Sequence, residues 1–181
     1  MAVSISYPVA RQIADHAEAE SPNEACGLIA GGSDHIAAAH PLRNIAAAPE
    51  TQFQADPEEQ LRALKAIDAA ELDWLGVYHS HPCAAPIPSE ADIRDCADAG
   101  LLHLIVSLER AKPQLKLWRL EKLSVTPIDL LYDTDDQPAP DRPLAKPQQA
   151  AVIIVGIVAL LIMLLIAFTL LPPAPDIMPA P

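Results

Sequence analysis

A single uncharged apolar segment divides this sequence into parts that cannot share one soluble fold. Residues 150–171 form a run of 22 amino acids without a charged side chain and with only one hydroxyl. As an α-helix, such a run extends for about 33 Å, which is enough to cross the roughly 30 Å hydrocarbon core of a bilayer. We therefore expect a transmembrane helix over residues 150–171.

The charges beside this segment predict its orientation. Arg142 and Lys146 precede it, and no Lys or Arg follows it. Because basic residues tend to stay on the cytoplasmic side, the large N-terminal part should face the cytoplasm. The N-terminus lacks a basic start followed by an apolar run, so we expect no signal peptide. The chain is thus predicted to be a single-pass protein of the cell membrane.

Composition defines the remaining parts and excludes some partners. We predict a domain over 1–132, a Pro/Asp-rich linker over 133–149 and a Pro-rich tail over 172–181. A net charge of −12 disfavours a nucleic-acid partner, because phosphate backbones repel an acidic surface. Cys26, Cys83 and Cys96 cannot all pair within one chain, so we expect reduced thiols. Nothing in the sequence predicts the oligomeric state.

Within the N-terminal part, helical and strand patterns are mixed. Helices are predicted to begin at Pro8, Pro57 and Ser89. Strands are predicted over 26–31, 34–42, 72–81, 101–109, 114–121 and 123–130. This order indicates an α/β (α+β) fold with a mixed β-sheet flanked by helices.

The segment 78–92 carries the residues with the clearest chemistry. His79 and His81 lie two apart on a predicted strand, so both imidazoles should project from the same face. Asp92 follows in the first turn of a predicted helix, after a Pro-rich loop. Two imidazoles and one carboxylate are a common ligand set for an open zinc site. Ser89 precedes Asp92 by one helical turn, and Glu24, in a loop before the strand 26–31, is a candidate base.

Each of these features also has a simpler explanation. The two histidines could be polar residues with satisfied hydrogen bonds at the end of a strand. Ser89 and Asp92 fit a helix N-cap that needs no metal. Glu24 could be a solvated loop residue. The spacing alone therefore leaves both interpretations open.

Taken together, the residues resemble a known motif. Glu24, the run His79-Ser80-His81-Pro82 and the later Ser89-x-x-Asp92 are similar to the JAMM motif of the MPN-domain (JAB/Mov34) metalloproteases. The resemblance covers about residues 5–130 and is strongest to small, single-domain prokaryotic members. It implies an MPN/JAB-like fold, with the layering of cytidine deaminases.

The resemblance also implies a role for each residue. His79, His81 and Asp92 would bind Zn²⁺, and Glu24 would accept a proton from the attacking water and pass it to the leaving amine. Ser89 would hydrogen-bond the water or the developing oxyanion. The implied activity is hydrolysis of a peptide or isopeptide bond after the C-terminal Gly-Gly of a ubiquitin-like or sulfur-carrier protein. That reaction would either remove a modifier from a lysine or release an amino acid from a carrier.

Three alternatives remain open from the sequence, one being that the anchored domain regulates a membrane partner through the helix itself. The domain could be a membrane-tethered module that binds a ubiquitin-like partner without cleaving it, with zinc structural or absent. Cys83 could be a fourth zinc ligand that closes the site, although a free thiol near the entrance is the simpler expectation. Among the other residues, we expect Cys26, Cys96, Trp74 and Trp118 to serve packing. His103 is expected to be a core histidine with one hydrogen-bond partner.

Overall fold

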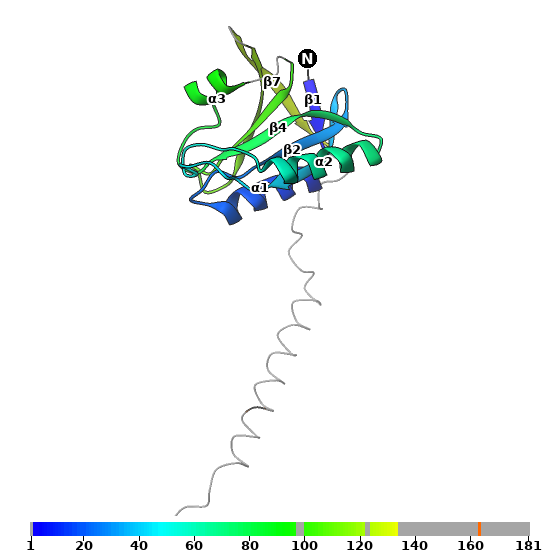
Figure 1. The fold of residues 1–181 in the computed structure, drawn as a ribbon. Coiled ribbons are helices and arrows are strands. Elements are labelled where there is room, and N and C mark those ends of the chain that lie inside the picture. Colours follow the sequence, from blue (N-terminus) through cyan, green and yellow to red (C-terminus); the bar gives the residue numbers. More distant parts are fainter. Residues whose placement is uncertain (1, 97–99, 122–123, 134–162, 164–181) are drawn as a thin grey trace, which may run out of the picture. The chain divides into compact units, whose positions relative to one another are not determined.

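The computed structural model describes residues 2–96, 100–121, 124–133 and 163 (Figure 1). The strands and helices described below belong to one compact unit, Met1–Gln137. In chain order they are β1 (Ala2–Ile5), α1 (Tyr7–Glu20), β2 (Cys26–Gly32), β3 (His35–Leu42), α2 (Pro57–Ala69), β4 (Asp73–His81), α3 (Glu90–Asp95), β5 (Leu102–Ser107), β6 (Gln114–Glu121) and β7 (Ser124–Tyr132). Every predicted strand and helix start in this part of the chain is confirmed to within two residues.

The strands form a mixed sheet, as predicted, but the sheet closes into a barrel. The strand order is β1-β3-β2-β4-β5-β6-β7, and β1 pairs in parallel with both β3 and β7. β1 is not among the predicted strands, because a strand of four residues gives almost no periodic signal. Closure follows from this short strand and leaves the sheet without a free edge.

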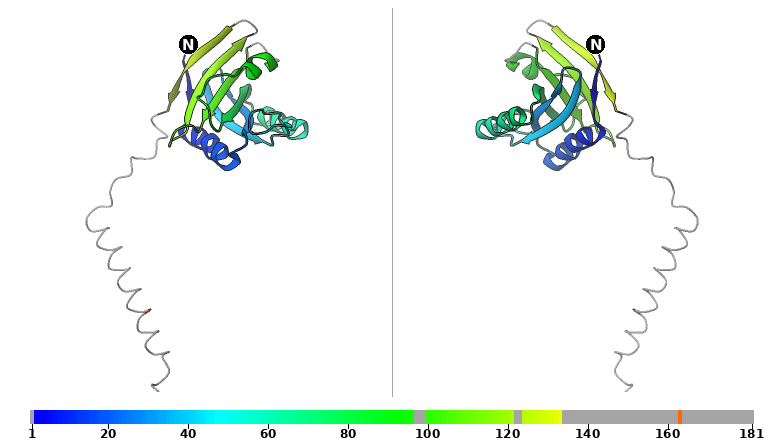
Figure 2. Two further views of the ribbon diagram at one scale, coloured as in Figure 1. Left: turned by 90° about the vertical axis from the view of Figure 1, so that its left-hand side faces the viewer. Right: turned by 90° about the vertical axis from the view of Figure 1, so that its right-hand side faces the viewer.

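The two longer helices pack on different parts of the barrel (Figure 2). The apolar side of α1, with Val9, Ile13 and Ala17, is buried against interior residues of the barrel, among them Ile36 and Tyr78. On α2, Ala63 and Ile67 pack with Cys26 and Leu28 on the opposite face of β2. The central strands β2 and β4 are therefore covered on both faces, and their positions are fixed.

A close backbone approach fixes the start of β4 beside β5. Gly76 faces Leu102 in the parallel β4–β5 pair. A Cβ atom at Gly76 would overlap the Leu102 backbone, lying 2.6 Å from its nitrogen and 2.7 Å from its carbonyl carbon. Only glycine therefore allows the two strands to come this close.

In the described part of the chain, no helix combines the length and apolar character needed to cross a membrane. The predicted transmembrane segment, 150–171, lies outside the described residues except for Met163. The linker from 134 and the tail over 172–181 also lie outside them. These predictions are therefore neither confirmed nor contradicted by the fold.

We predict that Gly76→Ala destabilises the domain by about 3 kcal/mol, because the added methyl group must push β4 from β5. Gly32→Ala is the matched control, since a Cβ there would meet nothing within 4 Å. Urea unfolding of both variants measures the difference. Equal stability of the two variants would show that the β4–β5 spacing does not depend on Gly76.

Candidate metal centre

The two candidate histidine ligands lie at the C-terminal end of β4, between two paired strands. His79 pairs with Cys26 of β2 on one side and with Ile105 of β5 on the other. His79 and His81 project from the same face of β4, as their spacing predicts. Both side chains are buried. Two flanking strands thus hold the two imidazoles in place.

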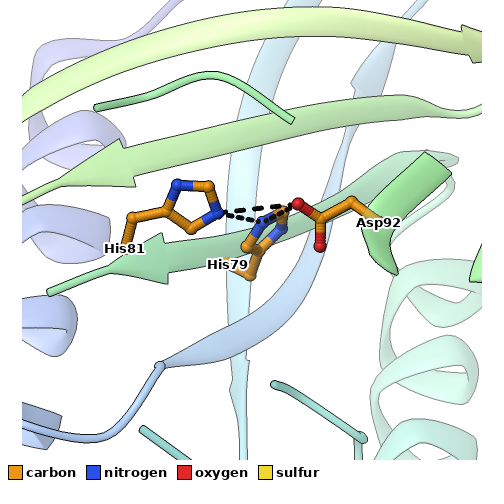
Figure 3. Close-up of side chains that lie close together, drawn as sticks. All are labelled: His79, His81 and Asp92. Atoms are coloured by element: carbon orange, nitrogen blue, oxygen red, sulfur yellow. Dashed lines mark hydrogen bonds and ion pairs between the residues drawn. The ribbon is translucent and has the colours of Figure 1, made fainter. Parts of the chain in front are cut away.

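Asp92 completes a group of three ligand atoms (Figure 3). The Nε2 atoms of His79 and His81 are 3.2 Å apart. Asp92 Oδ2 lies 3.4 Å from His79 Nε2 and 3.6 Å from His81 Nε2. Ligands about 2.05 Å from a tetrahedral zinc ion would be separated by roughly 3.3 Å. The observed spacing therefore fits Zn²⁺, and three protein ligands leave a fourth position open.

The surroundings of Nδ1, the ring nitrogen that faces away from the ligand group, differ between the two histidines. His81 Nδ1 lies 2.9 Å from the Ala85 carbonyl oxygen, to which its N–H can donate, so the Nε2 lone pair faces the other ligands. The His79 ring is stacked on Phe53 with ring centroids 4.5 Å apart. His79 Nδ1 is buried and lacks a hydrogen-bond partner among the described residues. Stacking, rather than a hydrogen bond, therefore orients His79.

Ser89 and Asp92 form the predicted capping box at the start of α3. The Asp92 N–H donates to Ser89 Oγ over 3.1 Å, and the Ser89 N–H donates to Asp92 Oδ2 over 2.7 Å. The simpler explanation of this pair is therefore confirmed, and it coexists with the ligand role of Asp92. In this cap Ser89 Oγ is the acceptor, so the pair does not use its hydroxyl proton. The catalytic role of Ser89 stays a prediction.

The charges of the three ligand side chains are coupled. Burial lowers the pKa of His79, although Asp92 opposes this effect. Burial also acts to lower the pKa of His81, but Asp92, the Ala85 carbonyl and Glu24 together outweigh burial, and the pKa is raised. For Asp92, the two histidines outweigh burial, and the pKa of the carboxyl lies well below its usual range. Asp92 is therefore ionised at neutral pH, as a metal ligand must be.

Glu24 reaches the site because β2 continues past its last paired residue. In the antiparallel β2–β4 register, Cys26 faces His79, so Glu24 lies opposite His81. Ser80 holds this extension: its N–H donates to the Ala25 carbonyl over 3.0 Å, and its Oγ accepts from the Ala25 N–H over 2.8 Å. The residue between the two histidines thus connects the candidate base to the ligand strand.

Asn44 holds the backbone of Glu24 from the other side. Its Nδ2 donates to the Glu24 carbonyl over 2.9 Å and to the Gln52 carbonyl over 3.0 Å. Its Oδ1 accepts from the N–H groups of Ala46 and Gln54, each over 3.0 Å. One amide side chain therefore ties Glu24 to the loop that carries Phe53.

Glu24 has the properties of a general base that works near neutral pH. Its side chain is buried, and burial is the main cause that raises its pKa to about 7. The charge of His81 acts to lower this pKa, and the charge of Asp92 acts to raise it, so Glu24 interacts electrostatically with both candidate ligands. A carboxylate with such a pKa can accept a proton and release it again at neutral pH. The solvated-loop explanation of Glu24 is therefore wrong.

The other predicted residues lie around this centre. Cys83 is exposed and is not part of the ligand group, so the geometry gives no support to a fourth sulfur ligand. Cys26 is buried in packing, as predicted. His103 is buried with its Nε2 3.5 Å from Cys96 Sγ. Both line a cavity of about 440 Å³ that reaches Asp92 and Phe53.

Sequence reasoning missed Phe53, Asn44 and the role of Ser80. Phe53 lies 26 positions before His79. A contact between a loop and a strand this far apart in the sequence leaves no periodic pattern from which it could be predicted. Asn44 acts through backbone groups, whose positions depend on the complete fold. Ser80 could have been found, because alternation along β4 turns it away from the ligands and toward the start of β2.

We predict that Glu24→Gln stabilises the metal-free protein at alkaline pH. The folded-state pKa of Glu24, about 7, lies above the ordinary value of 4.5. Folding therefore favours the neutral carboxyl, and this contribution to the stability of the wild type is lost as pH rises through about 7. The substituted glutamine stays neutral, so the variant should be more stable than wild type by about 2 kcal/mol near pH 8, and nearly equal near pH 4.5. Urea unfolding in a chelator measures both values. A difference that is independent of pH would contradict the raised pKa.

Comparison with known proteins shows the family to which the chain is similar. The family described as prokaryotic homologs of the JAB domain matches residues 6–121. A desampylase from Haloferax volcanii is 43% identical over 50% of this chain and 67% of its own length. A CysO-cysteine peptidase from Mycobacterium tuberculosis is 31% identical over 61% of this chain and 77% of its own.

A solved structure supports the fold. The solution structure of a protein from Desulfitobacterium hafniense is 32% identical, with a TM-score of 0.67 over 72% of this chain and 92% of that one. The range matched by the family, residues 6–121, spans the positions of Glu24, His79, His81, Ser89 and Asp92. The chain therefore belongs to the family of prokaryotic JAB-domain homologues.

Proposed function

We propose that this chain is a zinc metallopeptidase that cleaves after the C-terminal Gly-Gly of a ubiquitin-like or sulfur-carrier protein. The observation that carries the proposal is the buried Glu24 beside three convergent ligand atoms. A structural zinc site needs no base, so the alternative of a non-catalytic binding module leaves the position and raised pKa of Glu24 unexplained.

The side chains divide the chemistry among them. His79, His81 and Asp92 would hold the zinc ion, which supplies a Lewis acid that polarises the scissile carbonyl and acidifies a water molecule. Glu24 accepts the proton from the attacking water and then delivers it to the leaving amine. The hydroxyl of Ser89 donates to the oxygen on which negative charge develops.

Relatives of this chain support the substrate class. Besides the desampylase and the CysO-cysteine peptidase, a relative from Thermus thermophilus is named a probable TtuB-protein conjugate cleaving protease, with 40% identity over 44% of this chain. All three names describe cleavage of a protein conjugate or a carrier-linked amino acid. We infer the same class of substrate for this chain, covering both removal of a modifier and release of an amino acid.

We also propose that residues 150–171 anchor the domain to the cell membrane, with the catalytic domain in the cytoplasm. The support is the 22-residue uncharged run and the position of Arg142 and Lys146 before it. In this arrangement the Pro/Asp-rich segment 133–149 serves as a spacer between domain and membrane. Substrates at or near the membrane would then be favoured.

We predict that the zinc-loaded protein releases amines from Gly-Gly-terminated carrier proteins, and that Glu24→Gln lowers this rate by about 10²–10⁴-fold. Mass spectrometry of a panel of carriers, each joined to an amine by a peptide or isopeptide bond, follows cleavage after the second glycine. Glu50→Gln, at an exposed position, is the matched control and should cleave at the wild-type rate.

Two results would count against the proposal. If Glu24→Gln cleaves as fast as wild type, Glu24 is not the base. If the zinc-loaded wild type binds a carrier but cleaves no member of the panel, the binding module becomes the better explanation. A chelator should stop cleavage in the wild type, and added zinc should restore it.

We predict that the full chain sediments with membranes after an alkaline carbonate wash, whereas residues 1–137 stay in the soluble fraction. A membrane-impermeant maleimide should label the exposed Cys83 in inside-out vesicles but not in intact cells. Cys83→Ser identifies the signal from that thiol. Labelling of Cys83 in intact cells would reverse the proposed orientation.

A further inference from the structure

The metal ligand Asp92 is carried by an element that the core does not hold. The helix α3 has only six residues, Glu90–Asp95, and none of them is buried. Its apolar side chains, Ala91 and Ile93, are only half-buried. α3 also lies apart from both longer helices (Figures 1 and 2). The capping box fixes Asp92 relative to α3, but it cannot fix α3 relative to β4.

The loop over 82–88 connects β4 to α3, so the conformation of this loop determines where Asp92 lies relative to β4. Its sequence, PCAAPIP, contains three prolines, which have no N–H to donate. The backbone of this loop is left with carbonyl groups to be satisfied from outside. Among residues of 82–88, one internal hydrogen bond is seen, from the Ile87 N–H to the Ala85 carbonyl over 2.8 Å.

Three consecutive carbonyls of the loop accept from side chains on three different strands. The Ala84 carbonyl accepts from Ser107 Oγ of β5 over 2.7 Å. The next carbonyl, of Ala85, accepts from the ligand His81 of β4 over 2.9 Å. The Pro86 carbonyl accepts from Trp118 Nε1 of β6 over 3.0 Å. The three donors thus fix the loop against the sheet at three successive positions.

Ser107 and Trp118 are themselves well placed for this task. Ser107 is fully buried at the end of β5, where it pairs with His81 in register, and its Oγ also accepts from the Glu109 N–H over 3.2 Å. Trp118 projects from β6, which is paired to β5. Pro86 is buried, so losing the indole N–H donor at its carbonyl would be costly.

We propose that Ser107 and Trp118 are positioning residues of the metal centre. By fixing the carbonyls of Ala84 and Pro86, they hold the loop so that Asp92 meets His79 and His81. The same loop position presents the Ala85 carbonyl to His81 and so keeps its ring oriented. Neither side chain touches the reacting atoms. The inference rests on the proposed function for its biological meaning, but zinc affinity tests it without any substrate.

Replacement of Trp118 by Phe removes the N–H donor and keeps an aromatic ring. Partners outside the ligand set commonly change metal affinity by 10–100-fold, so we expect Trp118→Phe to weaken zinc binding by about 10-fold. The matched control is Trp74→Phe. The Trp74 indole also donates to a backbone carbonyl, of Gly76, over 2.8 Å, but at the far end of β4. This variant should bind zinc with wild-type affinity.

The experiment measures zinc affinity of the full chain in a mild detergent, by competition with a chelating dye. Thermal unfolding of each zinc-free variant is measured in parallel, since a general packing defect would lower stability as well as affinity. Hydrogen exchange of the zinc-free protein adds a local measurement. In Trp118→Phe, amides over 83–95 should exchange faster, while those of β4 and β5 should not change.

The outcomes separate the possible roles. Weaker zinc binding in Trp118→Phe alone, with cleavage restored at saturating zinc, supports a positioning role. Wild-type affinity in Trp118→Phe, or equal losses in both tryptophan variants, would overturn it. If Trp118→Phe does not fold, Ser107→Ala tests the other donor, and unchanged affinity there would also overturn the proposal. A chain that binds zinc as expected but cleaves no carrier would refute the proposed function and leave this inference intact.

Discussion

The pairing of β4 with β2 and β5 is the constraint on which the site depends. Antiparallel pairing with β2 brings Glu24 opposite His81, and parallel pairing with β5 places Ser107 beside the same histidine. A register shift of one residue would turn both imidazoles to the other face of β4 and remove the site. Two further features oppose such a register shift: the close approach of Gly76 to β5 and the hydrogen bonds between Ser80 and Ala25.

Two of the three candidate ligands, His79 and Asp92, have charge states that suit a metal. Burial keeps His79 neutral, while its neighbours keep Asp92 ionised. The third ligand needed for an open zinc site is His81, whose raised pKa reflects the acid beside it. Glu24 differs from Asp92 because no histidine hydrogen bond offsets its burial. This difference between the two carboxylates supports the proposed division, with Asp92 as ligand and Glu24 as base.

The sequence was informative where the chemistry depends on local spacing. The His-x-His alternation and the Ser89-x-x-Asp92 cap follow from strand and helix geometry, so both were predicted and both are present. Glu24 lies 55 positions before His79, and only the resemblance to the JAMM motif related the two. Contacts made by Phe53 and Trp118 depend on how distant strands and loops pack. Trp118 was predicted to serve packing, yet its indole N–H holds the loop before Asp92.

Two imidazoles, one carboxylate and one solvent molecule are expected around the metal of the zinc-loaded protein. X-ray absorption measures these atoms directly. The spectrum should show nitrogen and oxygen neighbours at about 2.0–2.1 Å, with no sulfur. A sulfur neighbour at about 2.3 Å would rule out this ligand set, because Cys83 would then close the site.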